Sequence, residues 1–257
     1  GDDRVLVVGG DTDGPGRAYE QLDSAEIYDP STGRWRLTGG LAQARLGHTA
    51  TVLRDGRVLV TGGCTGACAT SVEVFEPRTE TWAPTADMLT GRTRQHTATL
   101  LRDGRVLVVG GYDVDREMSV ELFDPQTGTW RLAAAMNAAR GAHSATLLGD
   151  GTVLVVGGYT PTGGTASPLA ERYDPARDEW TVPEQPSIAR SDHTATQLRD
   201  GRVLVVGGPP AVELYDPASG SWTTGGRLHE ARYAHTTTAL PDGGAIAIGG
   251  WGGSWAY

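Results

Sequence analysis

A double glycine that returns at a regular interval limits the folds open to this sequence more than any other feature. Gly-Gly closes an apolar run six times, with the first glycines at positions 9, 62, 110, 157, 207 and 249. The spacings of 53, 48, 47, 50 and 42 residues average 48. A period of this length indicates repeated supersecondary units, each of which completes its core only against a neighbouring unit.

Each repeat has the pattern of four short strands. From the second unit onward, Arg and His precede two apolar runs joined by Arg-Asp-Gly or a variant, as in ARLGHTATVLRDGRVLVTGG. A segment such as VEVFEP follows, then a turn and a tryptophan that opens the last strand (Trp35, Trp82, Trp130, Trp180 and Trp222). The continuous apolar runs predict strands covered on both faces, whereas the alternation in VEVFEP predicts a half-buried strand. No segment has an apolar period of about 3.6 residues, so we expect almost no helix.

Together these motifs resemble the kelch repeat: a double glycine, a Tyr or Phe in the third strand, a Trp opening the fourth, and Arg-x-x-His ahead of the first. The resemblance covers essentially the whole chain and implies an all-β, kelch-type β-propeller of four-stranded antiparallel blades. We predict a single domain over residues 1–257, with repeat units at 1–40, 41–88, 89–136, 137–186, 187–228 and 229–257. Six blades with incomplete terminal blades fit this division best, and five or seven blades are the alternatives. The resemblance fixes a fold and not an activity, because propellers serve both as binding modules and as enzymes.

The net charge of the chain limits the kinds of partner that we expect it to bind. With 31 acidic and 22 basic residues, the formal net charge is −9. Nucleic acids and anionic membranes need a basic face on the protein, so we expect neither as a partner. No apolar run approaches the ~20 residues of a membrane span, and the first residues, GDDRVLVVGG, do not have the pattern of a signal peptide. We expect a monomer. The location stays open, with a secreted or periplasmic one slightly favoured over a cytoplasmic one.

Residues that recur in every repeat are expected to be structural, because a catalytic group is needed only once. The Trp and Tyr/Phe series is expected to fill the space between neighbouring blades. The glutamates of the VEVF-like strands are expected to form the same hydrogen bonds or ion pair in each blade, with a repeat arginine as the candidate partner (Glu26, Glu73, Glu121, Glu171 and Glu213). The repeat histidines are expected to satisfy buried backbone groups, with a pocket or a metal ring as alternatives (His48, His96, His143, His193 and His235).

The arginines ahead of these histidines are the main ligand candidates. In most repeats the Arg stands three residues before the His, but in GRTRQH the pattern slips, and Arg92 and Arg94 stand four and two before it. The resemblance implies that ligands bind at the mouth of the central channel, where the inter-blade loops and the loops after the double glycines meet. There the guanidinium groups would attract a carboxylate, phosphate or sulfate. The predicted ligand-binding residues are Arg45, Arg94, Arg140, Arg190, Arg232, Tyr112, Asp113, Tyr159 and Trp251. The alternative is that each Arg stacks on or pairs with its neighbouring blade.

The loops after the double glycines differ most between repeats and are expected to set specificity. Two Asp-x-Asp pairs in them, Asp11 with Asp13 and Asp113 with Asp115, are read as solvated, with a calcium site as the alternative. Cys64 and Cys68, the only cysteines, share one such loop. A disulfide between them is favoured slightly over two free thiols. No metal or cofactor is expected.

Two functions from different classes remain open. The first is a module that binds a protein, peptide or glycan at the channel mouth. The second is a cofactor-independent isomerase, lyase or cyclase acting on a small anion in the central pocket. The blade motif is similar to that of galactose-oxidase-like copper enzymes, but here both cysteines lie in one loop and nearly all histidines are repeat residues. A set similar to that of kelch sugar epimerases can be assembled from Arg190, Asp192 and His193. We prefer the binding module.

Overall fold

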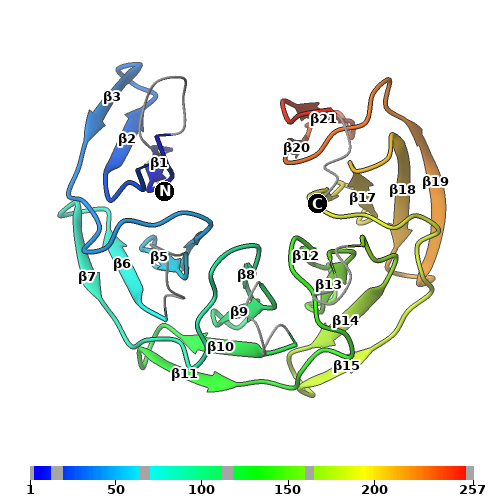
Figure 1. Cartoon of the computed structure of the whole chain (residues 1–257), viewed down its shortest axis with the longest axis horizontal. Coiled ribbons are helices and arrows are strands. Elements are labelled where there is room, and N and C mark those ends of the chain that lie inside the picture. The colour runs from blue at the N-terminus through cyan, green and yellow to red at the C-terminus, as the bar shows by residue number, and fades with distance from the viewer. Residues whose placement is uncertain (1–2, 13–19, 64–69, 112–117, 160–164, 253–257) are drawn as a thin grey trace. The chain divides into compact units, whose positions relative to one another are not determined.

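The computed structural model of the chain describes residues 3–12, 20–63, 70–111, 118–159 and 165–252, which form β-strands and no helix (Figure 1). The strands make six antiparallel sheets, which we number blade 1 to blade 6 in chain order. Blade 1 contains β1 (Val5–Val8), β2 (Ala25–Asp29) and β3 (Arg34–Leu37). Blade 2 contains β4 (Thr49–Val52), β5 (Val58–Thr61), β6 (Val72–Glu76) and β7 (Thr81–Pro84). Blade 3 contains β8 (Thr97–Leu100), β9 (Val106–Val109), β10 (Val120–Asp124) and β11 (Thr129–Leu132).

The second half of the chain repeats this plan. Blade 4 contains β12 (Ser144–Leu147), β13 (Val153–Val156), β14 (Ala170–Asp174) and β15 (Glu179–Thr181). Blade 5 contains β16 (Thr194–Gln197), β17 (Val203–Val206), β18 (Ala211–Asp216) and β19 (Ser221–Arg227). Blade 6 contains β20 (Thr236–Ala239) and β21 (Ala245–Ile248). The predicted six blades with incomplete terminal blades are therefore confirmed for the described residues.

The chain divides into two compact units. Unit 1 comprises Gly1–Asp113 and Glu121–Leu132, and unit 2 comprises Val114–Val120 and Ala133–Tyr257. Blades 1 to 3 lie essentially in unit 1, and blades 4 to 6 in unit 2. Within each unit the first strands of neighbouring complete blades adjoin, β4 with β8 and β12 with β16, and β16 adjoins β20 of blade 6. The prediction of a single domain stays a prediction.

The second strand of each complete blade forms the centre of its sheet. Strands β5, β9 and β13 are buried along their whole length, as the continuous apolar runs predict. The prediction of half-burial is wrong for the VEVF-like strands β6 and β10, where the first four residues are all buried. The polar residue in each of these strands is a glutamate whose carboxylate is itself buried. Polar and apolar residues therefore alternate along the strand without any alternation in exposure.

Aromatic pairs hold the outer strands of the blades together. The Tyr or Phe of the third strand faces the Trp of the fourth, as in Phe75 and Trp82, whose ring centroids lie 5.0 Å apart. The indole Nε1 of Trp82 also donates a hydrogen bond of 2.6 Å to the carbonyl of Gly39, in the segment that leaves blade 1. Phe75 packs with Ile27 of blade 1 in one apolar cluster. The predicted inter-blade role of these rings is confirmed.

Candidate functional site

In every blade that is followed by another in the same unit, the double glycine lies against the segment that enters the next blade. The N–H of the second glycine donates to the carbonyl of the next blade's arginine, as from Gly63 to Arg92 at 3.0 Å and from Gly158 to Arg190 at 2.7 Å. The connection from the second to the third strand therefore lies at the same end of the strands as the segment that carries the Arg and His. We call this end the loop end. The candidate ligand residues that the structure describes lie here.

The repeat arginines at the loop end are buried. Arg45, Arg92, Arg140 and Arg190 are each at most 2% exposed. Each pairs with the glutamate on the third strand of its own blade, as in Arg45 Nη2 with Glu73 Oε1 at 3.0 Å. The other three pairs are Arg92 with Glu121, Arg140 with Glu171, and Arg190 with Glu213. The expected Glu–Arg ion pair is confirmed.

These ion pairs correct the prediction that the arginines bind a ligand. Besides its glutamate, each guanidinium donates to the carbonyl of the first glycine of its own double glycine, as Arg140 does to Gly157 at 3.2 Å. The glutamates in turn accept the N–H groups of the incoming segment, so Glu171 binds Asn137 N–H at 2.8 Å. Burial lowers the pKa of Arg140, and the Glu171 carboxylate opposes that change. The guanidinium groups of Arg45, Arg140 and Arg190 are therefore buried and engaged in bonds within the loop ends of their own blades.

Arg94 and Arg232 differ from this set. The pair with Glu121 belongs to Arg92, so the repeat position in blade 3 is Arg92 and the side chain of Arg94 is exposed. Arg232 donates to the carbonyl of Gly249 at 2.8 Å. Blade 6 has no third strand among the described residues, so its arginine lacks the glutamate that the complete blades supply.

The side chains of the repeat histidines pack between neighbouring blades. His96 Nε2 lies 3.1 Å from the carbonyl oxygen of Thr61 on the preceding blade. A Cβ on Gly62 would stand 2.7 Å from His96 Cε1, so this position, at φ +67°, admits only glycine. Burial lowers the pKa of His96 and of His193 to about 3, and each keeps a neutral ring. The predicted structural role of the histidines is confirmed for His96. The described residues contain no cluster of three or more His, Cys, Asp and Glu side chains that fits a metal ion.

A rim of hydrogen-bonded backbone runs along the loop end of unit 2. The residue before each repeat histidine has a positive φ, at 55° for Ala142, 48° for Asp192 and 49° for Ala234. Asp192 N–H donates to the carbonyl of Ala142 at 3.1 Å, and Ala234 N–H donates to the carbonyl of Asp192 at 2.9 Å. These bonds fix the three segments side by side. Any side chain on one of them therefore has a defined position relative to the others.

Asp192 is the one carboxyl on this rim. Burial raises its pKa, while hydrogen bonds to its side chain from Tyr159 and Ser191 act in the opposite direction. Tyr159, a predicted ligand residue, is held through its backbone to Gly141 by bonds of 2.8 and 3.2 Å. Of the epimerase-like set, the structure leaves Asp192 partly accessible but buries Arg190 and His193.

An aromatic stack continues the rim. The rings of Tyr233 and Trp251 lie 5.1 Å apart at an interplanar angle of 21°. Their backbones exchange two hydrogen bonds of 3.1 Å, and Trp251 is 37% exposed. Because Tyr233 adjoins Ala234, the stack stands next to the segment bonded to Asp192. We call Tyr159, Asp192, Tyr233 and Trp251 the unit 2 rim. Tyr233 carried no recognisable signal in the sequence, since its place next to Trp251 depends on the pairing of the two segments.

Several sequence candidates fall outside the described residues: Asp13, Cys64, Cys68, Tyr112, Asp113 and Asp115. The disulfide and the calcium site therefore stay predictions. Asp11 is described and pairs through its backbone with Gln21. Within the described residues, no helix has the length and apolar character that crossing a membrane requires.

Similar proteins share the repeat and the fold. An F-box/kelch-repeat protein of Arabidopsis thaliana, At4g39580, is 39% identical over 70 residues, which are 27% of this chain and 18% of that protein. The structure of YjhT aligns at a TM-score of 0.72 and 15% identity, over 90% of this chain and 85% of that one. A fungal alcohol oxidase of the AA5 family, in complex with copper, aligns at a TM-score of 0.62 and 17% identity, over 98% of this chain and 68% of that one. At these identities the two structures show the fold alone.

A domain family described as the KLHDC2/KLHL20/DRC7 kelch-repeats domain matches residues 1–208. This span covers most of the chain and includes the Arg–Glu pairs of blades 2 to 4, five of the six double glycines and the aromatic pairs of blades 1 to 4. By their names, one of the similar proteins is an F-box/kelch-repeat protein and another is an alcohol oxidase, and a related architecture does not by itself give a function. The chain belongs to the kelch-repeat family and has its all-β propeller architecture.

Proposed function

We propose that this protein is a binding module that recognises a protein, peptide or glycan through the unit 2 rim and the variable loops beside it. The observation that carries the proposal is the stacked and partly exposed pair of Tyr233 and Trp251. A flat aromatic surface with polar neighbours suits sugar rings and the apolar parts of peptides. Tyr159 and Asp192 supply a hydroxyl and a carboxyl at a fixed place beside it.

The scaffold beneath the rim supports this use. The buried Arg–Glu pairs and the neutral histidines hold the loop end in place without contributing to its outer surface. Loops that rest on a rigid frame can vary without loss of the fold, and binding surfaces are often built in this way. The partner is expected to be neither nucleic acid nor membrane, because of the net charge of −9, and a monomer remains the expected state.

Arrays of glycans and peptides probed with the whole chain test the proposal. Trp251→Ala should weaken binding of the best ligand about tenfold or more, as expected for a central aromatic contact. Trp35→Ala is the matched control, because Trp35 is 51% exposed on β3 of unit 1. Equal losses in the two variants, or no loss in Trp251→Ala, would place the binding surface elsewhere.

Asp192 favours a second candidate, an enzyme without a cofactor that acts on a small organic anion. Burial raises the pKa of its carboxyl against the hydrogen bonds from Tyr159 and Ser191, and a carboxyl with a raised pKa would suit a general acid. Incubating the chain with sugar acids and hydroxy acids and following them by NMR tests this candidate. Turnover should be lost in Asp192→Asn and reduced in Tyr159→Phe. Turnover that survives Asp192→Asn would assign the chemistry to other residues.

A further inference from the structure

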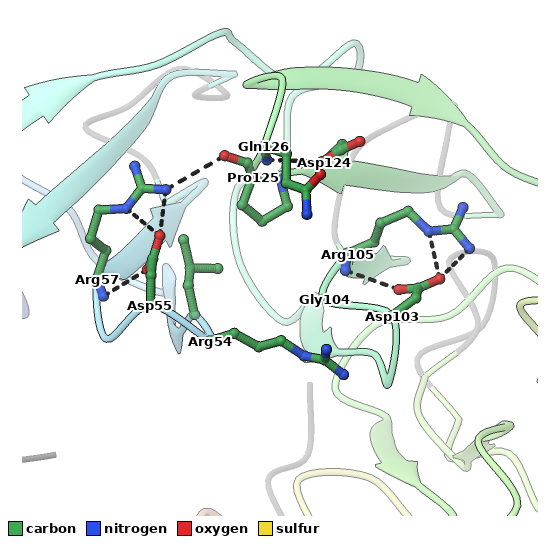
Figure 2. A pocket seen from close by; sticks show the side chains of 10 residues that line it. Arg54, Asp55, Arg57, Asp103, Gly104, Arg105, Asp124, Pro125 and Gln126 are labelled. Atoms are coloured by element: carbon green, nitrogen blue, oxygen red, sulfur yellow. Dashed lines mark hydrogen bonds and ion pairs between the residues drawn. The ribbon is translucent and has the colours of Figure 1, made fainter.

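A cleft lies in unit 1 at the other end of the strands, away from the loop end. It has a volume of about 570 Å³ and is lined by parts of three turns, Leu53–Arg57, Asp103–Arg105 and Asp124–Gln126. The first two join the first and second strands of blades 2 and 3, and the third joins β10 to β11. The volume is within the range of small-molecule sites. Figure 2 shows the side chains that face it.

Two of the three arginines in the cleft are already paired. Arg57 forms an ion pair of 2.7 Å with Asp55, and its Nη2 reaches the carbonyl of Pro125 at 3.5 Å. Arg105 forms an ion pair of 2.6 Å with Asp103. In Figure 2 these two pairs stand on opposite sides of the cleft. These pairs form part of the cleft wall, and within each pair the arginine and the aspartate neutralise each other's charge.

Arg54 is the exception. Among the described residues its side chain has no hydrogen bond or ion pair. Its aliphatic stem lies close to the neighbouring blade, since a Cβ built on Gly104 would stand 3.3 Å from Arg54 Cδ. The stem therefore passes over a glycine of the neighbouring blade, and the guanidinium extends beside the cleft. An unpaired guanidinium beside a cleft is suited to an anionic ligand.

The fold does not require an arginine at this position. In blade 2 the turn is closed by Leu53 N–H to the carbonyl of Arg57 at 2.8 Å and by Gly56 N–H to that of Leu53 at 3.0 Å. The corresponding bonds in blade 4 have the same lengths, 2.8 and 3.0 Å, although Gly149 stands in the place of Arg54. In blade 6 the residue is Pro241, and the corresponding bonds are 2.8 and 3.1 Å. The side chain of Arg54 is therefore available for a role other than folding.

The residues around Arg54 determine which kinds of anion the cleft favours. Asp124, whose Oδ1 accepts the N–H of Gln126 at 2.9 Å, stands at the edge of the cleft. Because Asp55 and Asp103 are paired with Arg57 and Arg105, Asp124 adds a negative charge, which opposes ligands that carry two or more negative charges more than those with one. Leu53 and Pro125 offer apolar contact for the body of a ligand. A carboxylate fits the planar guanidinium through two parallel hydrogen bonds.

We propose that this cleft is a binding site for a small organic acid with a single carboxylate, whose charge is met by Arg54. The site is separate from the unit 2 rim and does not depend on the proposed function.

Titration of the whole chain with benzoate, followed by NMR with inorganic phosphate as the comparison anion, tests the site. Benzoate should bind more tightly than phosphate, and Arg54→Gln should weaken benzoate binding at least tenfold while the circular dichroism spectrum is unchanged. Arg199→Gln is the matched control, since Arg199 occupies the same place in the turn of blade 5 and is likewise exposed. Its binding should equal that of the unmodified chain. The proposal is overturned if phosphate binds as tightly as benzoate, if Arg54→Gln binds benzoate normally, or if Arg199→Gln weakens binding equally.

Discussion

Acidification should destabilise this protein well above the pH at which its carboxylates titrate. His96 and His193 are buried, with exposed fractions of 5% and 8%, and both have a pKa lowered to about 3. Burial is the main cause, and the positive charges of Arg92 and Arg190 act in the same direction. In the unfolded chain each ring has a pKa of about 6.5. Below that pH the unfolded state binds protons that the folded state does not, so stability present at neutral pH is lost as the pH falls toward 3.

The slope of the free energy of unfolding against pH follows from the number of protons that the unfolded state binds and the folded state does not. Each histidine contributes about 1.4 kcal/mol per pH unit in this range, so two of them reduce the free energy of unfolding by about 5 kcal/mol between pH 6.5 and 4.5. This loss is comparable to the whole stability of a small domain, about 5–15 kcal/mol. Carboxylates with lowered pKa, such as Glu80 at about 2, add their loss at lower pH. The raised pKa of Asp192 works in the opposite direction.

Urea unfolding followed by tryptophan fluorescence at pH 7.5, 6.5, 5.5 and 4.5 measures the slope. His96→Gln and His193→Gln should each reduce it by about 1.4 kcal/mol per pH unit, whatever they do to stability at neutral pH. His229→Gln is the control, because His229 is exposed and lies outside the repeat positions. A free energy of unfolding that stays constant from pH 6.5 to 4.5 would refute the reasoning. An equal change of slope in the control would refute it as well.

Two further pairs of substitutions test the scaffold by urea unfolding at neutral pH. Glu121→Gln should lower the free energy of unfolding by about 3–5 kcal/mol, because it leaves a buried arginine without its carboxylate; Glu26→Gln, at the exposed equivalent on β2, should change it by less than about 0.5 kcal/mol. Gly62→Ala combines a φ of +67° with a clash against His96, whereas Gly10→Ala has a φ of +102° and no atom within 4 Å. The first should therefore cost more than the second, and similar losses would show that backbone strain alone decides.

Much of the fold could be predicted from the sequence because the repeat presents every structural feature several times. Tryptophans at five equivalent places predicted the last strands of the repeats, and the structure pairs each with a Tyr or Phe on the strand before it. The incomplete terminal blades followed from counting strands against glycine pairs, and the sheets of three and two strands confirm them. Periodic apolar residues fix strands locally, so these features needed no knowledge of packing.

The ligand site was harder to predict because no local pattern in the sequence tells a buried charged side chain from an exposed one. Arg140 was expected at an open channel mouth, yet it is 1% exposed against Glu171. The sequence did contain a signal, since arginine and glutamate recur in the same repeats, but a guanidinium can pair with a carboxylate or with a ligand. In blade 3 two arginines flank the expected position, and only the contact with Glu121 identifies Arg92 as the repeat residue. Which recurring charges neutralise each other depends on distances between strands far apart in sequence.

The positions that remain for function are those where the fold accepts many side chains. The residue before the repeat histidine keeps a positive φ whether it is glycine, glutamine, alanine or aspartate, from 73° at Gly47 to 48° at Asp192. The first residue of the Asp-Gly turn is likewise arginine, glycine or proline with the same backbone hydrogen bonds. The fold does not need the carboxyl of Asp192 or the guanidinium of Arg54, so both groups are available for a role other than folding. In a repeat protein, a charged side chain at a tolerant position is therefore a stronger indication of function than a charged residue that pairs within the fold in every complete blade.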